Sequence, residues 1–128
     1  MPVFDPQNDM GALQARLEKS SELTIVCYCA AWCDTCTQYR PGYEALAAQY
    51  EQHTFVWVDI EEHPDLLEDE DVENFPTVLI QAPRGNLFYG VLQPHAVHLD
   101  RLISRCDADA AVTTAGPSAL LQLLRQGA

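Results

Sequence analysis

The chain has 128 residues, 48% of them hydrophobic, which is enough to bury one core and too few for two ordinary domains. Its 19 acidic and 7 basic residues give a formal net charge of −12, which argues against nucleic acid and anionic membranes as partners. The first thirty residues lack the pattern of an export signal, and no apolar run approaches the length that crosses a bilayer. We therefore expect a cytoplasmic protein.

Apolar periodicity predicts alternating helices and strands along the first 106 residues. A helix capped by Asp9 and ended by Ser20-Ser21 comes first. A strand of apolar and β-branched residues, typical of a strand covered on both faces, follows it. The two strands around the turn at 83–85 should form an antiparallel hairpin. In chain order, the elements expected after the first helix are a strand at 24–30, a helix from 33 to about 52, a strand at 54–60, a short helix at 64–70, strands at 77–81 and 87–91, and a helix at 96–106.

We expect the domain to span residues 1–106, with 107–128 as a linker and a short amphipathic segment. Residues 107–116 are rich in Ala, Asp, Thr and Gly, as flexible connectors are. The leucines that follow form one helical stripe, but a helix of about ten residues is marginal unless it packs on something. Its partner is either the domain's own surface or another chain.

The five cysteines favour redox chemistry or metal binding. Their number is odd, and four of them cluster between Cys27 and Cys36, unlike the framework of a secreted disulfide scaffold. Cys33 should lie at the first turn of a helix, where unsatisfied N–H groups and the helix dipole stabilise a thiolate. Cys36 follows three residues later, within disulfide reach.

This placement predicts a dithiol mechanism. The Cys33 thiolate attacks a substrate disulfide, and Cys36 then attacks Cys33 and releases reduced substrate, which leaves a Cys33–Cys36 disulfide. The competing interpretation is a zinc half-site, but zinc needs a second ligand pair. Cys27 and Cys29 lie within the predicted core strand and Cys106 is distant in sequence, so we expect no metal and no other cofactor.

A series of short motifs in a fixed order resembles the thioredoxin superfamily over roughly residues 20 to 106. The resemblance implies a thioredoxin-like α/β fold, with a central mixed sheet of four to five strands flanked by helices. It also implies a cis peptide bond before Pro76 and a substrate groove lined by Trp32, Phe75, Pro76 and Gly90. The motifs are Trp32-Cys33-x-x-Cys36 with Pro41 after it, Val58-Asp59 ahead of Pro64, Asn74-Phe75-Pro76-Thr77, and Gly90 after the hairpin.

The chain departs from the thioredoxin pattern at positions expected to tune the active site. Asp34 and Thr35 stand where thioredoxins have Gly-Pro, and Cys27 and Trp57 stand where thioredoxins have a buried Asp and its Lys partner. The absence of both charged residues together is physically reasonable, because either one alone would be an unpaired charge in the core. Cys29 replaces a common aromatic residue, and we interpret Cys27 and Cys29 as small apolar filling of the strand.

The leading hypothesis is a thiol:disulfide oxidoreductase that reduces protein disulfides. By resemblance, a thioredoxin reductase that uses flavin and NADPH would supply the electrons. Two alternatives remain open. One is a thioredoxin-fold binding module or chaperone with little redox turnover, and the other is a metal or cluster carrier that uses Cys33 and Cys36 across a dimer.

Overall fold

The computed structural model has a five-stranded mixed sheet at its centre, which confirms the predicted fold class. It describes residues 3–19, 22–30, 32–67, 70, 72, 75–93, 95–106 and 111–127, so Asn74 and the first part of the expected linker, 107–110, lie outside the described residues. The strand order is β1-β3-β2-β4-β5. The strands are β1 (Val3–Phe4), β2 (Thr24–Cys29), β3 (Thr54–Asp59), β4 (Thr77–Ala82) and β5 (Gly85–Val91).

Strand β2 is the centre of the sheet. It pairs in parallel with β3 and antiparallel with β4, and all six of its residues are buried. This position explains why its sequence is apolar without alternation, since both of its faces are covered. The predicted hairpin is confirmed, with β4 antiparallel to β5.

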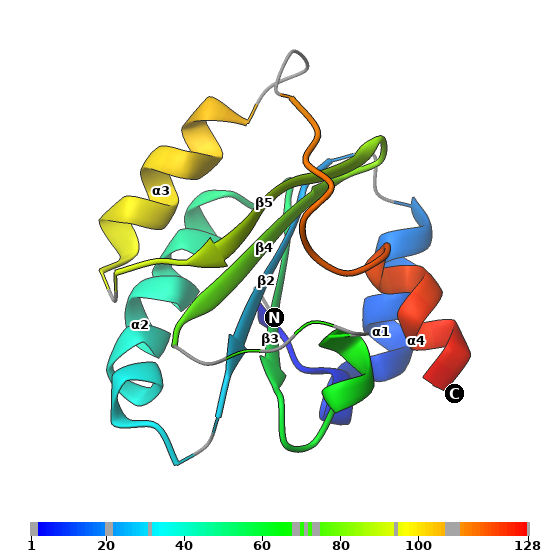
Figure 1. Ribbon diagram of the computed structural model, residues 1–128, viewed down its shortest axis with the longest axis horizontal. Helices are drawn as coiled ribbons and strands as arrows, with labels where there is room; N and C mark the ends of the chain where they lie inside the picture. The colour runs from blue at the N-terminus through cyan, green and yellow to red at the C-terminus, as the bar shows by residue number, and fades with distance from the viewer. Residues whose placement is uncertain are drawn as a thin grey trace.

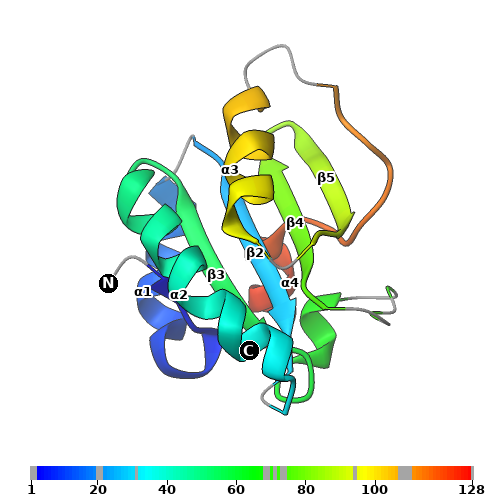
Figure 2. The same ribbon diagram turned by 90° about the vertical axis from the view of Figure 1, so that its left-hand side faces the viewer.

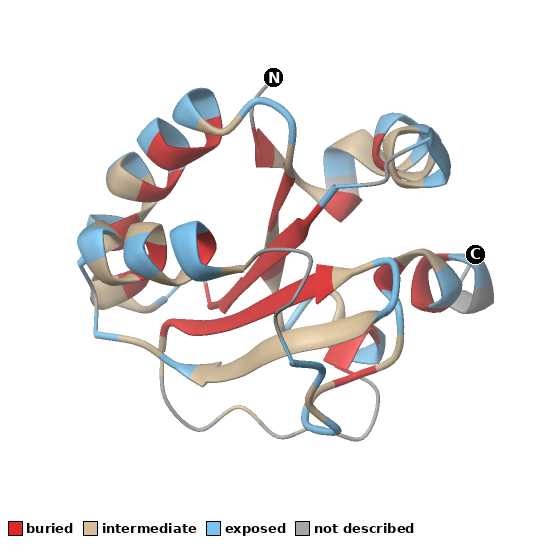
Figure 3. Ribbon diagram, turned by 90° about the horizontal axis from the view of Figure 1, so that it is seen from above, coloured by how far each residue is buried: buried red, intermediate tan, exposed pale blue. Residues whose placement is uncertain are grey.

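Helices cover both faces of the sheet. Helices α2 (Asp34–Gln49) and α3 (Ala96–Arg105) lie on one face (Figures 1 and 2). Helix α1 (Pro6–Lys19), the single 3₁₀ turn η1 (Pro64–Leu67) and α4 (Leu120–Gly127) lie on the other. Seen from above, the buried residues follow the central strands and the inward sides of the helices (Figure 3). The protein therefore has three layers and two apolar cores, one on each face of the sheet.

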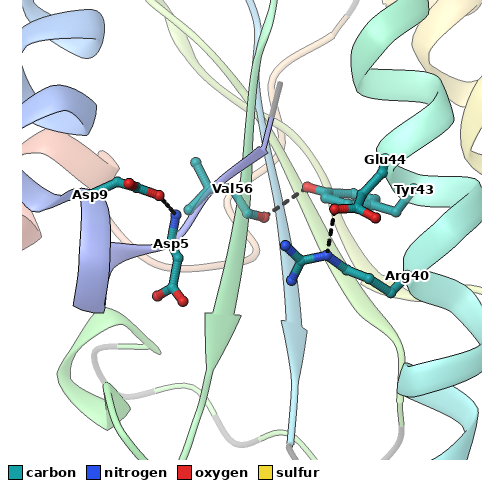
Figure 4. Close-up of polar contacts among 6 residues, drawn as sticks. All are labelled: Asp5, Asp9, Arg40, Tyr43, Glu44 and Val56. Carbon is teal, nitrogen blue, oxygen red and sulfur yellow. Dashed lines mark hydrogen bonds and ion pairs between the residues drawn. The ribbon is translucent and has the colours of Figure 1, made fainter. Parts of the chain in front are cut away.

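The N-terminal elements differ from the prediction. Helix α1 begins at Pro6, one turn before the predicted start, and Asp9 has non-helical backbone angles that separate this added turn from the predicted helix after it. The Asp9 carboxylate accepts the backbone N–H of Asp5 at 3.0 Å, so it reaches back to the chain before the helix (Figure 4). Strand β1 is absent from the predicted elements, because two residues are too few to form a recognisable pattern. It pairs in parallel with β3 at the edge of the sheet.

The C-terminal segment packs on the domain itself. Leu120, Leu123 and Leu124 are buried in the core beneath α1 and η1. Two side chains of the hairpin bind the chain that leads to α4: Gln81 donates to the Ser118 carbonyl and accepts the Leu120 N–H, and Asn86 donates to the carbonyls of Ala115 and Pro117. From Thr113 onward, the expected connector is therefore held against β4 and β5.

Within the described residues, no helix combines the length and apolar character needed to cross a membrane.

Candidate active site

The cysteine turn lies between the end of β2 and the start of α2. Cys33 is the N-cap of α2, in an extended backbone conformation, and its carbonyl accepts the N–H of Thr37 at 3.2 Å. The Cys33 N–H donates to the carbonyl of Ala30 at 3.0 Å, which closes the turn. Cys33 is half-buried, whereas Cys36 is 2% exposed. The turn therefore presents the first cysteine and hides the second.

The disulfide differs from the expected Cys33–Cys36 bond. Cys36 is bonded to Cys29, with 5.9 Å between the two Cα atoms, and Cys33 carries a reduced thiol. Cys29 and Cys36 both lie inside the core between β2 and α2, whereas Cys33 lies at its edge. The interpretation of Cys29 as simple apolar filling is therefore wrong.

Cys27 completes a group of three buried sulfurs. Its Sγ lies 3.8 Å from the Sγ of Cys29, because residues two apart on a strand face the same side of the sheet. Burial raises the pKa of the Cys27 thiol well above its ordinary value, and the charge of Arg40 opposes this only in part. Cys27 is therefore a neutral thiol packed against the disulfide. Its register partner on β3 is Trp57, so the two tuning positions named from the sequence are neighbours.

Arg40 is a component of the site that sequence reasoning missed. Its guanidinium carbon lies 4.8 Å from the centroid of the Trp57 ring, and its Nε lies 3.4 Å from a carboxylate oxygen of Glu44. The Tyr43 hydroxyl lies 2.7 Å from the Val56 carbonyl, so this face of α2 is tied to the sheet (Figure 4). Arg40 follows Cys36 by four residues, and that helical spacing is the signal that places it on this face.

The predicted groove residues are only partly brought together. The Trp32 side chain is 67% exposed, and its ring packs edge-on against Phe75 with the centroids 5.7 Å apart. The Phe75–Pro76 peptide bond is cis, and the Pro76 carbonyl accepts a backbone N–H from the chain after β5. Gly90 lies in β5 opposite Val78, beside the Phe88 ring.

The remaining predicted residues lie at the start of α2. Asp34 is exposed at the first position of the helix, and Thr35 is half-buried after it. Among the residues that the structure describes, no group of three or more His, Cys, Asp or Glu side chains is arranged to hold a metal ion. The chemistry that this geometry offers is thiol–disulfide exchange, with Cys33 at the surface and a disulfide behind it.

Comparison with known proteins agrees with this chemistry. The family model described as thioredoxin matches residues 7–90. Thioredoxin H2 of Arabidopsis thaliana is 26% identical over 92 residues, 72% of this chain and 68% of the relative, and thioredoxin 1 of Plasmodium falciparum is 35% identical over 57 residues, 44% of this chain and 55% of the relative. The crystal structure of thioredoxin NaTrxh from Nicotiana alata superposes with a TM-score of 0.67 at 23% identity, covering 81% of this chain and 91% of that one. At that identity, the last likeness concerns the fold alone.

Proposed function

The chain belongs to the thioredoxin family, and we propose that it reduces protein disulfides with Cys33 as the attacking thiol and Cys36 as the resolving thiol. It is a thiol:disulfide oxidoreductase, as its thioredoxin relatives support. The observation that carries the residue assignment is the contrast between a half-buried Cys33 at the N-terminus of α2 and a buried Cys36 within its first turn.

The proposed cycle begins with both thiols reduced. The Cys33 thiolate attacks one sulfur of the substrate disulfide, forms a mixed disulfide and expels the other sulfur as a thiolate. Cys36 then attacks the Cys33 sulfur and expels the second substrate thiolate. Because Cys36 is bonded to Cys29 in the structure, that bond has to be reduced before a cycle starts.

Trp32 and Phe75 would supply an apolar surface for the substrate beside Cys33. Their rings pack on one another, and Trp32 remains largely exposed. In the proposal, the backbone around the cis Phe75–Pro76 bond binds the substrate chain in extended form. Reduction by a thioredoxin reductase and a cytoplasmic location stay predictions from the sequence.

A binding module with little turnover is the alternative, and one observation favours it: the proposed resolving thiol is already engaged with Cys29. Insulin reduction with dithiothreitol as donor separates the two. We expect the wild-type chain to accelerate insulin precipitation, and Cys33→Ser and Cys36→Ser to return it to the rate of dithiothreitol alone. Cys106→Ser is the matched control and should retain the wild-type rate, since Cys106 is the C-cap of α3 and takes no part in the proposed cycle. A folded wild-type protein that adds nothing to the dithiothreitol rate would support the binding module.

A further inference from the structure

Three buried sulfurs lie directly behind Cys33. Cys29 and Cys36 are joined by a disulfide, and the Sγ of Cys27 is 3.8 Å from that of Cys29. The exposed fractions of Cys27, Cys29 and Cys36 are 0%, 1% and 2%. The proposed cycle uses only Cys36 of these three, so it leaves Cys27 and Cys29 without a role.

Cys36 lies within bonding reach of two different cysteines. Cys33 precedes it by three residues at the start of the same helix, and Cys29 faces it from β2 with 5.9 Å between the Cα atoms, a usual separation for a disulfide. Cys36 is thus the sulfur that the two alternative disulfides would share.

We propose that Cys29 is a second resolving thiol, which forms a disulfide with Cys36 in place of the Cys33–Cys36 disulfide that turnover leaves. This inference rests on the proposed roles of Cys33 and Cys36. In the transfer, the Cys29 sulfur attacks Cys36, the Cys29–Cys36 bond forms and the Cys33–Cys36 bond breaks. The proton that Cys29 loses is balanced by the one that Cys33 gains, so the step is an isomerisation that needs no outside oxidant or reductant.

Solvation favours the inward disulfide. A disulfide carries no charge, so burying it costs little, whereas a thiol released at the edge of the core keeps contact with water. The buried position disfavours charge, as the raised pKa of the neighbouring Cys27 indicates. The Cys33 sulfur, in contrast, is released at the N-terminus of α2, beside the backbone N–H groups of the first helical turn.

The transfer changes the reactivity of the oxidised protein. When the disulfide joins β2 to α2, Cys33 is again a thiol at the edge of the core. The chain as a whole remains oxidised by two electrons, because the disulfide has moved and has not been reduced. In this state Cys33 can form a mixed disulfide that Cys36 is unable to resolve. Oxidation therefore converts a reductase into a protein that captures a disulfide substrate covalently.

The test is a time course of disulfide mapping on the full chain. The reduced protein is mixed with one equivalent of hydroxyethyl disulfide, quenched with acid, alkylated with N-ethylmaleimide and cleaved with chymotrypsin. Cleavage after the aromatic residues separates Cys29, on peptide 29–32, from Cys33 and Cys36, on peptide 33–39.

We expect the bond within peptide 33–39 to appear first and then to decline as the two peptides become cross-linked, with Cys33 alkylated in the product. Cys29→Ala and Cys29→Ser should stop at the first species, and Cys106→Ser should follow the wild-type course. A wild-type protein that keeps the bond within 33–39 and alkylates Cys29 would overturn the proposal. That readout needs no folded variant and no protein substrate, so it is separate from the insulin assay, whose failure would overturn the proposed function instead.

Discussion

The cysteines differ in exposure, and we expect their reactivity to follow it. In the reduced protein, we expect iodoacetamide at pH 8 to label Cys33 first, Cys36 much more slowly, and Cys27 only on unfolding. Alkylation requires the thiolate, and burial raises the pKa of Cys27 well above its ordinary value. Peptide mass spectrometry at increasing labelling times measures the order. Labelling of Cys27 at the rate of Cys33 in the folded protein would contradict the described core.

His53 should make stability depend on pH. Its Nδ1 accepts the backbone N–H of Leu23 at 3.2 Å, and burial lowers its pKa while the charge of Glu22 partly restores it. A lowered pKa means that the unfolded state binds more protons, so stability from this group is present above about pH 6.5 and is lost as the pH falls toward the folded value.

His53→Asn is the matched variant, because its side-chain oxygen keeps an acceptor near the same place without titrating. Urea unfolding at pH 7.5 and pH 5.5 should show a larger loss for the wild type than for the variant. Equal losses for the two proteins would show that His53 does not carry the effect.

Among the secondary-structure elements, helix α4 covers a part of one sheet face that the short turn η1 does not cover. The turn η1 has four residues, and the buried leucines of α4 pack in the same core as Leu66 and Leu67. We expect Leu124→Ala to lower the free energy of unfolding by about 2–5 kcal/mol, as for other fully buried leucines. Leu121→Ala, on the half-buried side of the same helix, should cost about 1 kcal/mol or less. Chemical denaturation of both variants measures this, and equal small effects would mean that α4 does not pack as described.

The predictable elements were those with strong local patterns. The buried run of β2, the hairpin and the apolar spacing of α2 and α3 all appear within a few residues of their expected bounds. The Leu stripe of α4 was equally visible, but its packing depends on Gln81 and Asn86, whose side chains hold the preceding chain across sequence separations of 39 and 31 residues. Such side-chain hydrogen bonds to a distant backbone leave no local pattern.

The candidate site was predictable where it depended on one segment and less so where two segments meet. The Cys33–Cys36 turn follows from one segment of the chain. The neighbouring positions of Cys27 on β2 and Trp57 on β3 were indicated only by the resemblance to thioredoxins. The alternation that puts Cys29 on the face of Cys27 was present in the sequence, but its bond to Cys36 also depends on where α2 crosses the sheet. The position of that crossing is determined by how the helices pack on the sheet and leaves no local pattern in the sequence.

At the scale of the whole molecule, the net charge of −12 should select among small disulfide substrates. Cationic cystamine should oxidise the reduced protein faster than neutral hydroxyethyl disulfide, and anionic dithiodiglycolate should be slowest, since the field of the protein attracts cations. We expect roughly tenfold between the extremes at low ionic strength, and convergence near 1 M salt, where the Debye length is about 3 Å. Stopped-flow tryptophan fluorescence follows the rates. If the oxidation rates of the three disulfides keep the same order at high salt, their differences come from leaving-group chemistry and not from the charge of the protein.

In the proposed function, Cys33 attacks the substrate and Cys36 resolves the mixed disulfide. Its most direct measurement is the mass of the covalent adduct that reduced Cys36→Ser forms with insulin, located by chymotryptic mapping. We predict a persistent adduct on Cys33, within peptide 33–39. Cys33→Ser should form none. An adduct on Cys29, or none at all from a folded Cys36→Ser protein, would contradict the assignment.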